Sequence, residues 1–154
     1  MDEDKSFLGQ GWSFPPTFSN NGNRGIIMVA NEEDIRQSLE ILLSTSLGER
    51  TMLPEYGCDL QSYLFDTISN SKVHFLKELV RTAIINYEPR IDLNEVLIDY
   101  SDYQEGIIRI ELDYTIETTN TRFNLVFPYY KVEGTDIPQL YQEKVTQTTS
   151  HEQE

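Results

Sequence analysis

The clearest structural pattern in the chain lies in the segment Ile107-Ile-Arg-Ile-Glu-Leu-Asp-Tyr-Thr-Ile116. Apolar side chains fall at every second position from Ile108 to Ile116, and polar or charged side chains fill the positions between them. Because successive side chains of a β-strand point to opposite faces, this alternation predicts a strand with one buried and one solvent-facing side. A sheet with one wet face is typical of antiparallel pairing.

Two further segments with a period of two flank this strand. Apolar and polar residues alternate over 91–100, and Gly106 marks the turn that follows. A third strand is predicted over 123–127, and Pro128 is expected to end it because proline cannot donate to a strand ladder. Three strands are close to the lower limit for independent stability and leave two unpaired edges. The strand over 107–116 is long enough to act as a template for a strand from another protein.

Helices are predicted on the N-terminal side of these strands. The spacing of apolar residues predicts a helix over 31–47, a short helix over 59–65, and a long helix that begins at Ser69 or Ser71 and ends at Pro89. The predicted fold class is therefore α+β, with about three helices packed on one face of a small antiparallel β-meander.

The chain divides into three parts by composition. Residues 1–30 form a predicted extended arm, since glycines and prolines interrupt any helix or long strand. This arm also holds four aromatic side chains, which are Phe7, Trp12, Phe14 and Phe18. Disordered tails are usually poor in aromatic residues, so we expect the arm to dock on a partner or on its own domain. Residues 31–133 form the predicted α+β domain, and residues 134–154 form a polar tail.

Charge and composition exclude several classes of function. The chain has 154 residues, enough for one domain, and a formal net charge of −14. Such a chain repels phosphate groups, so neither nucleic acid nor an anionic membrane is an expected partner. Cys58 is the single cysteine and cannot form an internal disulfide, which suits assembly in a reducing compartment. No apolar run approaches the roughly 20 residues of a membrane span, and the acidic N-terminus does not resemble a secretory signal.

Candidates for chemistry are few. Two histidines and one cysteine cannot build a usual zinc site, and no nucleotide-binding or hydrolase motif occurs, so we predict neither a metal nor a cofactor. Carboxylates in or near loops, which are Glu49, Glu55, Asp59 and Glu88, could line a groove as in a glycosidase. Most acidic side chains are simply solvated, and we therefore predict that the protein is not an enzyme.

The tripeptide Glu88-Pro89-Arg90 follows the longest predicted helix. Pro89 fixes its own φ and favours an extended conformation at Glu88, so the two charged side chains should project from the same side. The planar guanidinium of arginine binds carboxylates in a bidentate way and suits interfaces. Such a corner can hold together two elements or two chains. The alternative is a local salt bridge at the helix end, worth roughly 0–1 kcal/mol if exposed.

At these residues the chain resembles the small baseplate-wedge family of contractile injection systems, whose members are also called sheath initiators. The tripeptide, the preceding segments 43–50 and 54–57, the opening Gly9–Pro15, and the segment 124–130 are all similar to family segments. The family occurs in contractile phage tails, in type VI secretion baseplates and in extracellular phage-tail-like particles. Some of its relatives carry the name lysozyme.

The resemblance implies a structural role rather than a catalytic one. Family members contact the larger baseplate wedge subunits and offer the surface on which the sheath protein assembles, with inner tube or hub proteins as further candidate partners. The expected interface residues are those that match family segments, namely Trp12, Phe14, Gly48, Glu49, Arg50, Pro54, Gly57, Glu88, Pro89 and Arg90. We expect cytoplasmic assembly followed by incorporation into a baseplate. The alternative function is a lysozyme-like hydrolase that cleaves peptidoglycan.

Overall fold

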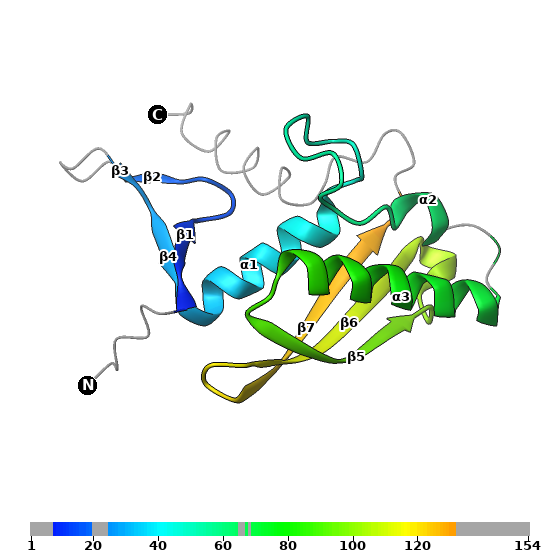
Figure 1. Cartoon of the computed structure of the whole chain (residues 1–154). Helices are drawn as coiled ribbons and strands as arrows, with labels where there is room; N and C mark the ends of the chain where they lie inside the picture. The colour runs from blue at the N-terminus through cyan, green and yellow to red at the C-terminus, as the bar shows by residue number, and fades with distance from the viewer. Residues whose placement is uncertain (1–7, 20–24, 65–66, 68, 132–154) are drawn as a thin grey trace, which may run out of the picture.

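The computed structural model of the chain describes residues 8–19, 25–64, 67 and 69–131, and it has an α+β fold (Figure 1). In chain order its elements are β1 (Gln10–Trp12), β2 (Phe18–Ser19), β3 (Gly25–Ile26), β4 (Met28–Ala30), α1 (Asn31–Ser44), α2 (Gln61–Leu64), α3 (Asn70–Tyr87), β5 (Ile91–Asp99), β6 (Ile107–Ile116) and β7 (Thr121–Tyr130). The predicted tail over 134–154 lies outside the described residues.

The main sheet has three antiparallel strands in the order β5-β6-β7. β6 is the alternating segment that the sequence predicted, and every second residue from Ile108 to Ile116 is buried. It is the central strand, however, and it pairs with β5 on one side and β7 on the other. The prediction that 107–116 offers itself as a template is therefore wrong, because both of its edges are already hydrogen-bonded. Within the described residues, β5 and β7 form the edges of this sheet.

β7 continues to Tyr130 instead of ending at Pro128. Pro128 lies opposite Arg109 of β6 in a continuous register. An edge strand tolerates proline where the missing N–H faces away from the sheet, and β7 is such a strand. The prediction that Pro128 stops the strand was wrong because the sequence alone did not show which strands lie at the edges.

Within the described residues the fold has two long helices rather than about three. α1 and α3 span 14 and 18 residues, whereas the short helix predicted over 59–65 is a single turn, α2. α3 begins as predicted, since the Ser69 side chain accepts a hydrogen bond from the Lys72 N–H, and it ends just before Pro89. α1 ends at Ser44, earlier than predicted, and Leu47 is half-exposed in the loop that follows.

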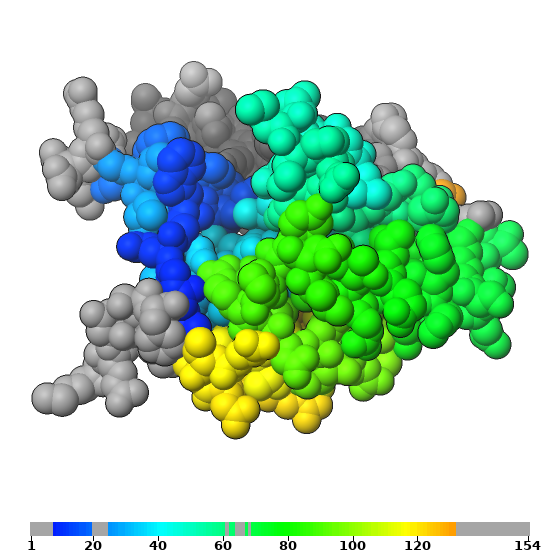
Figure 2. Space-filling view, in the orientation of Figure 1, coloured from blue at the N-terminus to red at the C-terminus, as the bar shows by residue number. Residues whose placement is uncertain are grey.

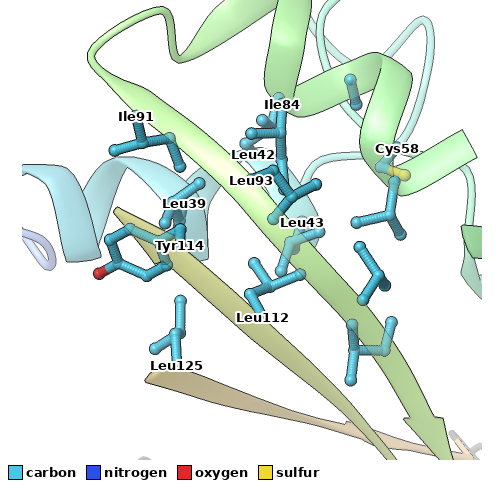
Figure 3. Close-up of a cluster of buried hydrophobic side chains, with 14 of the residues drawn as sticks. Leu39, Leu42, Leu43, Cys58, Ile84, Ile91, Leu93, Leu112, Tyr114 and Leu125 are labelled. Atoms are coloured by element: carbon cyan, nitrogen blue, oxygen red, sulfur yellow. The ribbon is translucent and has the colours of Figure 1, made fainter. Parts of the chain in front are cut away.

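The core lies between the two long helices and one face of the sheet. Figure 3 shows side chains of α1, α3 and all three strands that meet there, among them Leu39, Ile84, Leu93, Leu112 and Leu125. The opposite face of β6 carries Arg109, Glu111 and Asp113, which remain partly exposed. The one-sided sheet that the alternation predicted is thus confirmed.

The N-terminal segment is more regular than expected. β1 pairs antiparallel with β4, and β2 pairs antiparallel with β3, so the described part of the segment forms a narrow folded ribbon beside α1 (Figure 1). Leu8, at its start, is only 1% exposed and belongs to the core of the domain.

Candidate functional site

The corner between α3 and β5 is held by an ion-pair cluster around Arg90. Its Nε and Nη2 atoms donate to the two carboxylate oxygens of Glu88 at 2.6 and 2.7 Å, a bidentate arrangement. Its Nη1 donates to Asp34 Oδ2 at 2.6 Å and to the backbone oxygen of Leu8 at 2.8 Å. We call these four residues the Arg90 cluster. It joins three parts of the chain that are distant in sequence.

The cluster is partly buried, and burial strengthens the attraction between its opposite charges. The Glu88 side chain is 2% exposed, and those of Asp34 and Arg90 are 16% and 29% exposed. Hydrogen bonds to Glu88, and then to Asp34, raise the pKa of Arg90 above its usual value. Since the Glu88 carboxylate is almost entirely buried, it depends on Arg90 for electrostatic compensation. The cluster is therefore more than the exposed salt bridge that the sequence analysis considered as an alternative.

Glycines allow the N-terminal segment to approach this cluster. A Cβ at Gly11 would lie 2.3 Å from Asp34 Oδ1, and one at Gly9 would lie 3.2 Å from Arg90 Nη1. Real Cβ atoms essentially never come as close as the first of these distances. β1 can thus lie directly over the first turn of α1 because it carries no side chain at position 11.

The loop over 46–57 is ordered by its own backbone. Gly48 N–H donates to Pro54 O at 2.8 Å and closes the loop, and Ser46 N–H donates to Glu49 Oε2 at 2.9 Å. At its end, Gly57 has φ +119°, and a Cβ there would lie 2.3 Å from the Thr45 carbonyl oxygen. Glycine is therefore required at position 57 for both its conformation and its contact.

Aromatic contacts fix the loop to the C-terminal end of α3. The guanidinium of Arg50 lies 4.1 Å from the ring centroid of Tyr56, a cation–π contact. The ring of Tyr56 in turn packs edge-on against Tyr87 with centroids 5.0 Å apart. Tyr87 directly precedes Glu88, so the loop and the Arg90 cluster flank the same end of the helix.

The N-terminal ribbon turns its aromatic side chains outward. Trp12 is 64% exposed, Phe14 is 47% exposed and Phe18 is 72% exposed. The backbone beneath them is fixed, because the Phe14 N–H donates to Oε1 of the buried Gln37 at 2.7 Å. The backbone of the described part of the arm thus packs on its own domain, whereas the aromatic side chains of Trp12, Phe14 and Phe18 do not, and docking of the arm on a partner stays a prediction.

The structure brings together some of the predicted interface residues and separates others. Glu88 and Arg90 form one cluster, and Gly48, Glu49, Arg50, Pro54 and Gly57 form one loop. Pro89, Glu49, Arg50, Pro54, Trp12 and Phe14 are exposed, whereas Glu88 and Gly57 are buried. The last two can affect a partner only by positioning their neighbours.

The four carboxylates considered for hydrolysis fall into two pairs with different surroundings. Glu49 and Glu88 bind groups of their own chain. Glu55 and Asp59 line a groove beside α3.

Across residues 8–19, 25–64, 67 and 69–131, no group of three His, Cys, Asp or Glu side chains is placed to hold a metal ion. No helix in that part of the chain combines the length and the apolar character needed to cross a bilayer.

Sequence reasoning missed three residues that position these features. Asp34 lies in the first turn of α1, and its carboxylate binds Arg90. Leu8 contributes a carbonyl oxygen to the Arg90 cluster, and Gln37 binds the arm. Of these three residues, only Gln37 carried a signal in the sequence, and that signal was weak: this polar residue lies between Ile35 and Leu39 on the buried side of α1.

Fold and site together define the class of protein. It is a small α+β domain in which an internal ion-pair cluster holds a helix-to-strand corner, with an ordered loop and an aromatic ribbon facing outward. The family model for the baseplate wedge protein gp25 matches residues 29–121, which include both long helices, the loop and the Arg90 corner. This chain belongs to that baseplate wedge family.

Individual proteins similar to this chain include two from baseplates and one that bears a lysozyme name. The baseplate wedge protein gp25 of Enterobacteria phage T4 is 31% identical over 90 residues, covering 57% of this chain and 68% of the phage protein. A Geobacter sulfurreducens protein, provisionally named a tail lysozyme, is 37% identical with a TM-score of 0.64, over 72% of this chain and 100% of that one. A chain of the anti-feeding prophage baseplate is 25% identical with a TM-score of 0.58, over 91% of this chain and 96% of that one.

Proposed function

We propose that this protein is a structural component of the baseplate of a contractile, phage-tail-like injection system, in which it joins the larger wedge subunits and initiates sheath assembly by strand addition. Membership of the baseplate wedge family supports the structural role. The outer edge of β7, unpaired within the described residues, is the observation that carries the sheath part of the proposal. The protein assembles in the cytoplasm and is incorporated into the baseplate there.

β7 is a better acceptor for an added strand than β5. β7 pairs with β6 in continuous register from Thr121 to Tyr130. The register of β5 shifts between Leu93 and Glu95, and such a bulge bends an edge and discourages further pairing. On β7 an incoming sheath strand would form main-chain hydrogen bonds over a longer straight edge.

Pro128 identifies which backbone groups of β7 face outward. Since it has no N–H, its nitrogen lies on the side away from β6. Residues two positions apart in a strand share the same orientation, so the N–H of Val126 also points to the open edge. The Val126 side chain is 48% exposed and contributes little to the core.

The interface with the wedge subunits is proposed at the Arg90 corner, the 46–57 loop and the aromatic ribbon. All three present exposed side chains on a backbone that the chain itself holds in place, as in Arg50, Pro89 and Trp12. Preorganised surfaces bind with a smaller loss of conformational entropy, which suits a permanent assembly.

The experiment is a proline substitution at the proposed acceptor edge. Val126→Pro removes one outward N–H, and Val126→Thr is the matched control that keeps it. We expect Val126→Pro chains to fold and to enter baseplates, while electron micrographs show those baseplates without sheath. Sheaths of normal length on Val126→Pro baseplates would contradict strand addition at β7.

The name of the Geobacter sulfurreducens relative favours one alternative, hydrolysis of peptidoglycan. Of the four carboxylates considered for hydrolysis, Glu55 and Asp59 lie on one groove, which Glu78 also lines. Purified protein would then release soluble fragments from peptidoglycan, and Glu55→Gln would abolish that release. If high concentrations of the protein release no fragments, the hydrolase is excluded.

A further inference from the structure

A groove separates the loop from the exposed side of α3. Its volume is about 420 Å³, and it is lined on one side by Leu47, Glu55 and residues 57–59 and on the other by residues of α3 between Phe75 and Tyr87. Figure 2 shows the face on which the loop stands above α3. We call this feature the α3 groove.

The walls of the α3 groove are apolar and accessible. Leu47 is 52% exposed on the loop side, Phe75 is 49% exposed on the helix side, and Leu79 lies one turn further along α3. From Phe75 to Tyr87 the helix rises by about 18 Å, or slightly more than three turns. Large apolar side chains gathered on an exposed concave surface indicate a binding site.

The charged groups of the α3 groove all have one sign. Glu55 and Asp59 lie on the loop side and Glu78 on the helix side, while none of the described lining residues is lysine or arginine. Apolar walls with carboxylates on both sides fit a segment that is apolar on one side and cationic at its margins.

We propose that the α3 groove binds an amphipathic helix of a partner protein, with an apolar face flanked by lysine or arginine. The length of the groove matches about three turns of helix. A second copy of this chain, with a net charge of −14, would be repelled from the acidic margins. Residues 132–154 of the chain itself are also disfavoured by charge, since they hold five Asp and Glu against one Lys. This proposal does not depend on strand addition at β7.

The test uses two synthetic helical peptides of about four turns with the same leucine face, one flanked by lysine and the other by glutamate. Their binding to the full chain is measured by fluorescence anisotropy at two salt concentrations. We expect the lysine-flanked peptide to bind roughly tenfold more tightly than the glutamate-flanked one, and more weakly at high salt.

Paired variants separate the α3 groove from the overall charge of the protein. Glu78→Lys and Glu105→Lys change the net charge equally, but only Glu78 lines the groove. Phe75→Ala and Ile85→Ala each truncate an exposed apolar side chain of α3, and only Phe75 lines the groove. We expect the two groove variants to weaken peptide binding about tenfold and the two controls to leave it unchanged.

Three results would overturn the proposal. One is equal binding of the two peptides, and another is an equal loss of affinity in each groove variant and its control. The third is a dimer of the free protein in sedimentation that Phe75→Ala dissociates, which would assign the groove to a second copy. Leu47→Ala repeats the measurement from the loop side and does not alter α3.

Discussion

The guanidinium of Arg90 donates a 2.8 Å hydrogen bond to the backbone oxygen of Leu8, although 82 positions separate the two residues in the chain. Leu8 is buried in the core, and Arg90 also holds Glu88 and Asp34. The start of the arm, the first turn of α1 and the corner before β5 therefore share one cation. A change at Arg90 is expected to affect all three at once.

Arg90→Ala should destabilise the domain by about 3 kcal/mol, since it leaves the buried carboxylate of Glu88 without its partner. The measurement is the free energy of unfolding in urea. Arg122→Ala is the control, because Arg122 also binds a carboxylate, that of Asp113, but its own side chain is 72% exposed. That control should lose less than about 1 kcal/mol. Similar losses in the two variants would show that the Arg90 cluster behaves as a surface salt bridge.

Alanine substitutions at two glycines of the loop should lower the free energy of unfolding by different amounts. Gly57→Ala brings a Cβ within 2.3 Å of the Thr45 backbone oxygen, whereas Gly48 has a positive φ of 80° and no atom within 4 Å of its Cβ position. Gly48→Ala should cost about 1–2 kcal/mol, from the left-handed conformation alone. Gly57→Ala should cost clearly more, because backbone must move. The free energy of unfolding of both variants is measured in urea. Equal losses would mean that the backbone at the end of the loop can move away from a Cβ at position 57 at little cost.

The parts of this fold that the sequence predicted are those encoded by local spacing. The alternation over 107–116 predicted β6, and Pro89 predicted the end of α3, since both effects act within a few residues. The order of strands in the sheet, by contrast, depends on contacts between residues that are distant in sequence. For that reason β6 was assigned as an open template, and Pro128 as a strand end.

The residues of the candidate site also divide into those that local spacing predicts and those that only long-range packing brings together. Glu88 and Arg90 could be paired from the sequence because a single residue separates them, although residues 89 and 90 form a turn and not the extended backbone that was expected. Asp34 and Leu8 could not be found, because they meet Arg90 only after α1 and the arm have packed. Gly11 had looked like a breaker of regular structure, but its role is to let β1 approach Asp34.

Alkaline pH should destabilise the protein through its buried thiol. Burial raises the pKa of Cys58 from 9.0 to about 12. The unfolded chain therefore loses this proton first, so the contribution of Cys58 to stability is complete below pH 9 and declines as the pH rises towards 12. Burial also raises the pKa of Tyr129, which acts in the same direction.

The measurement for this effect is urea unfolding between pH 8 and pH 11. One such group changes the free energy of unfolding by up to about 1.4 kcal/mol per pH unit above pH 9. Cys58→Ala should lower stability at pH 8 by creating a cavity, and it should flatten the decline at higher pH. An unchanged decline in Cys58→Ala would assign the effect to tyrosines instead.

Trp12→Ala separates the two roles of the N-terminal ribbon. The Trp12 side chain is 64% exposed, and β1 is held to β4 by backbone pairing of Trp12 with Met28, so the free energy of unfolding should change by less than about 0.5 kcal/mol. If the ribbon binds a wedge subunit through its aromatic side chains, the same variant should be recovered in far fewer baseplates, because aromatic anchors contribute most of the energy of an interface. Ile85→Ala, which truncates an apolar side chain exposed to 63% on α3, is the control and should assemble normally. Full incorporation of Trp12→Ala would remove the ribbon from the interface and leave the Arg90 corner and the loop as the proposed contacts.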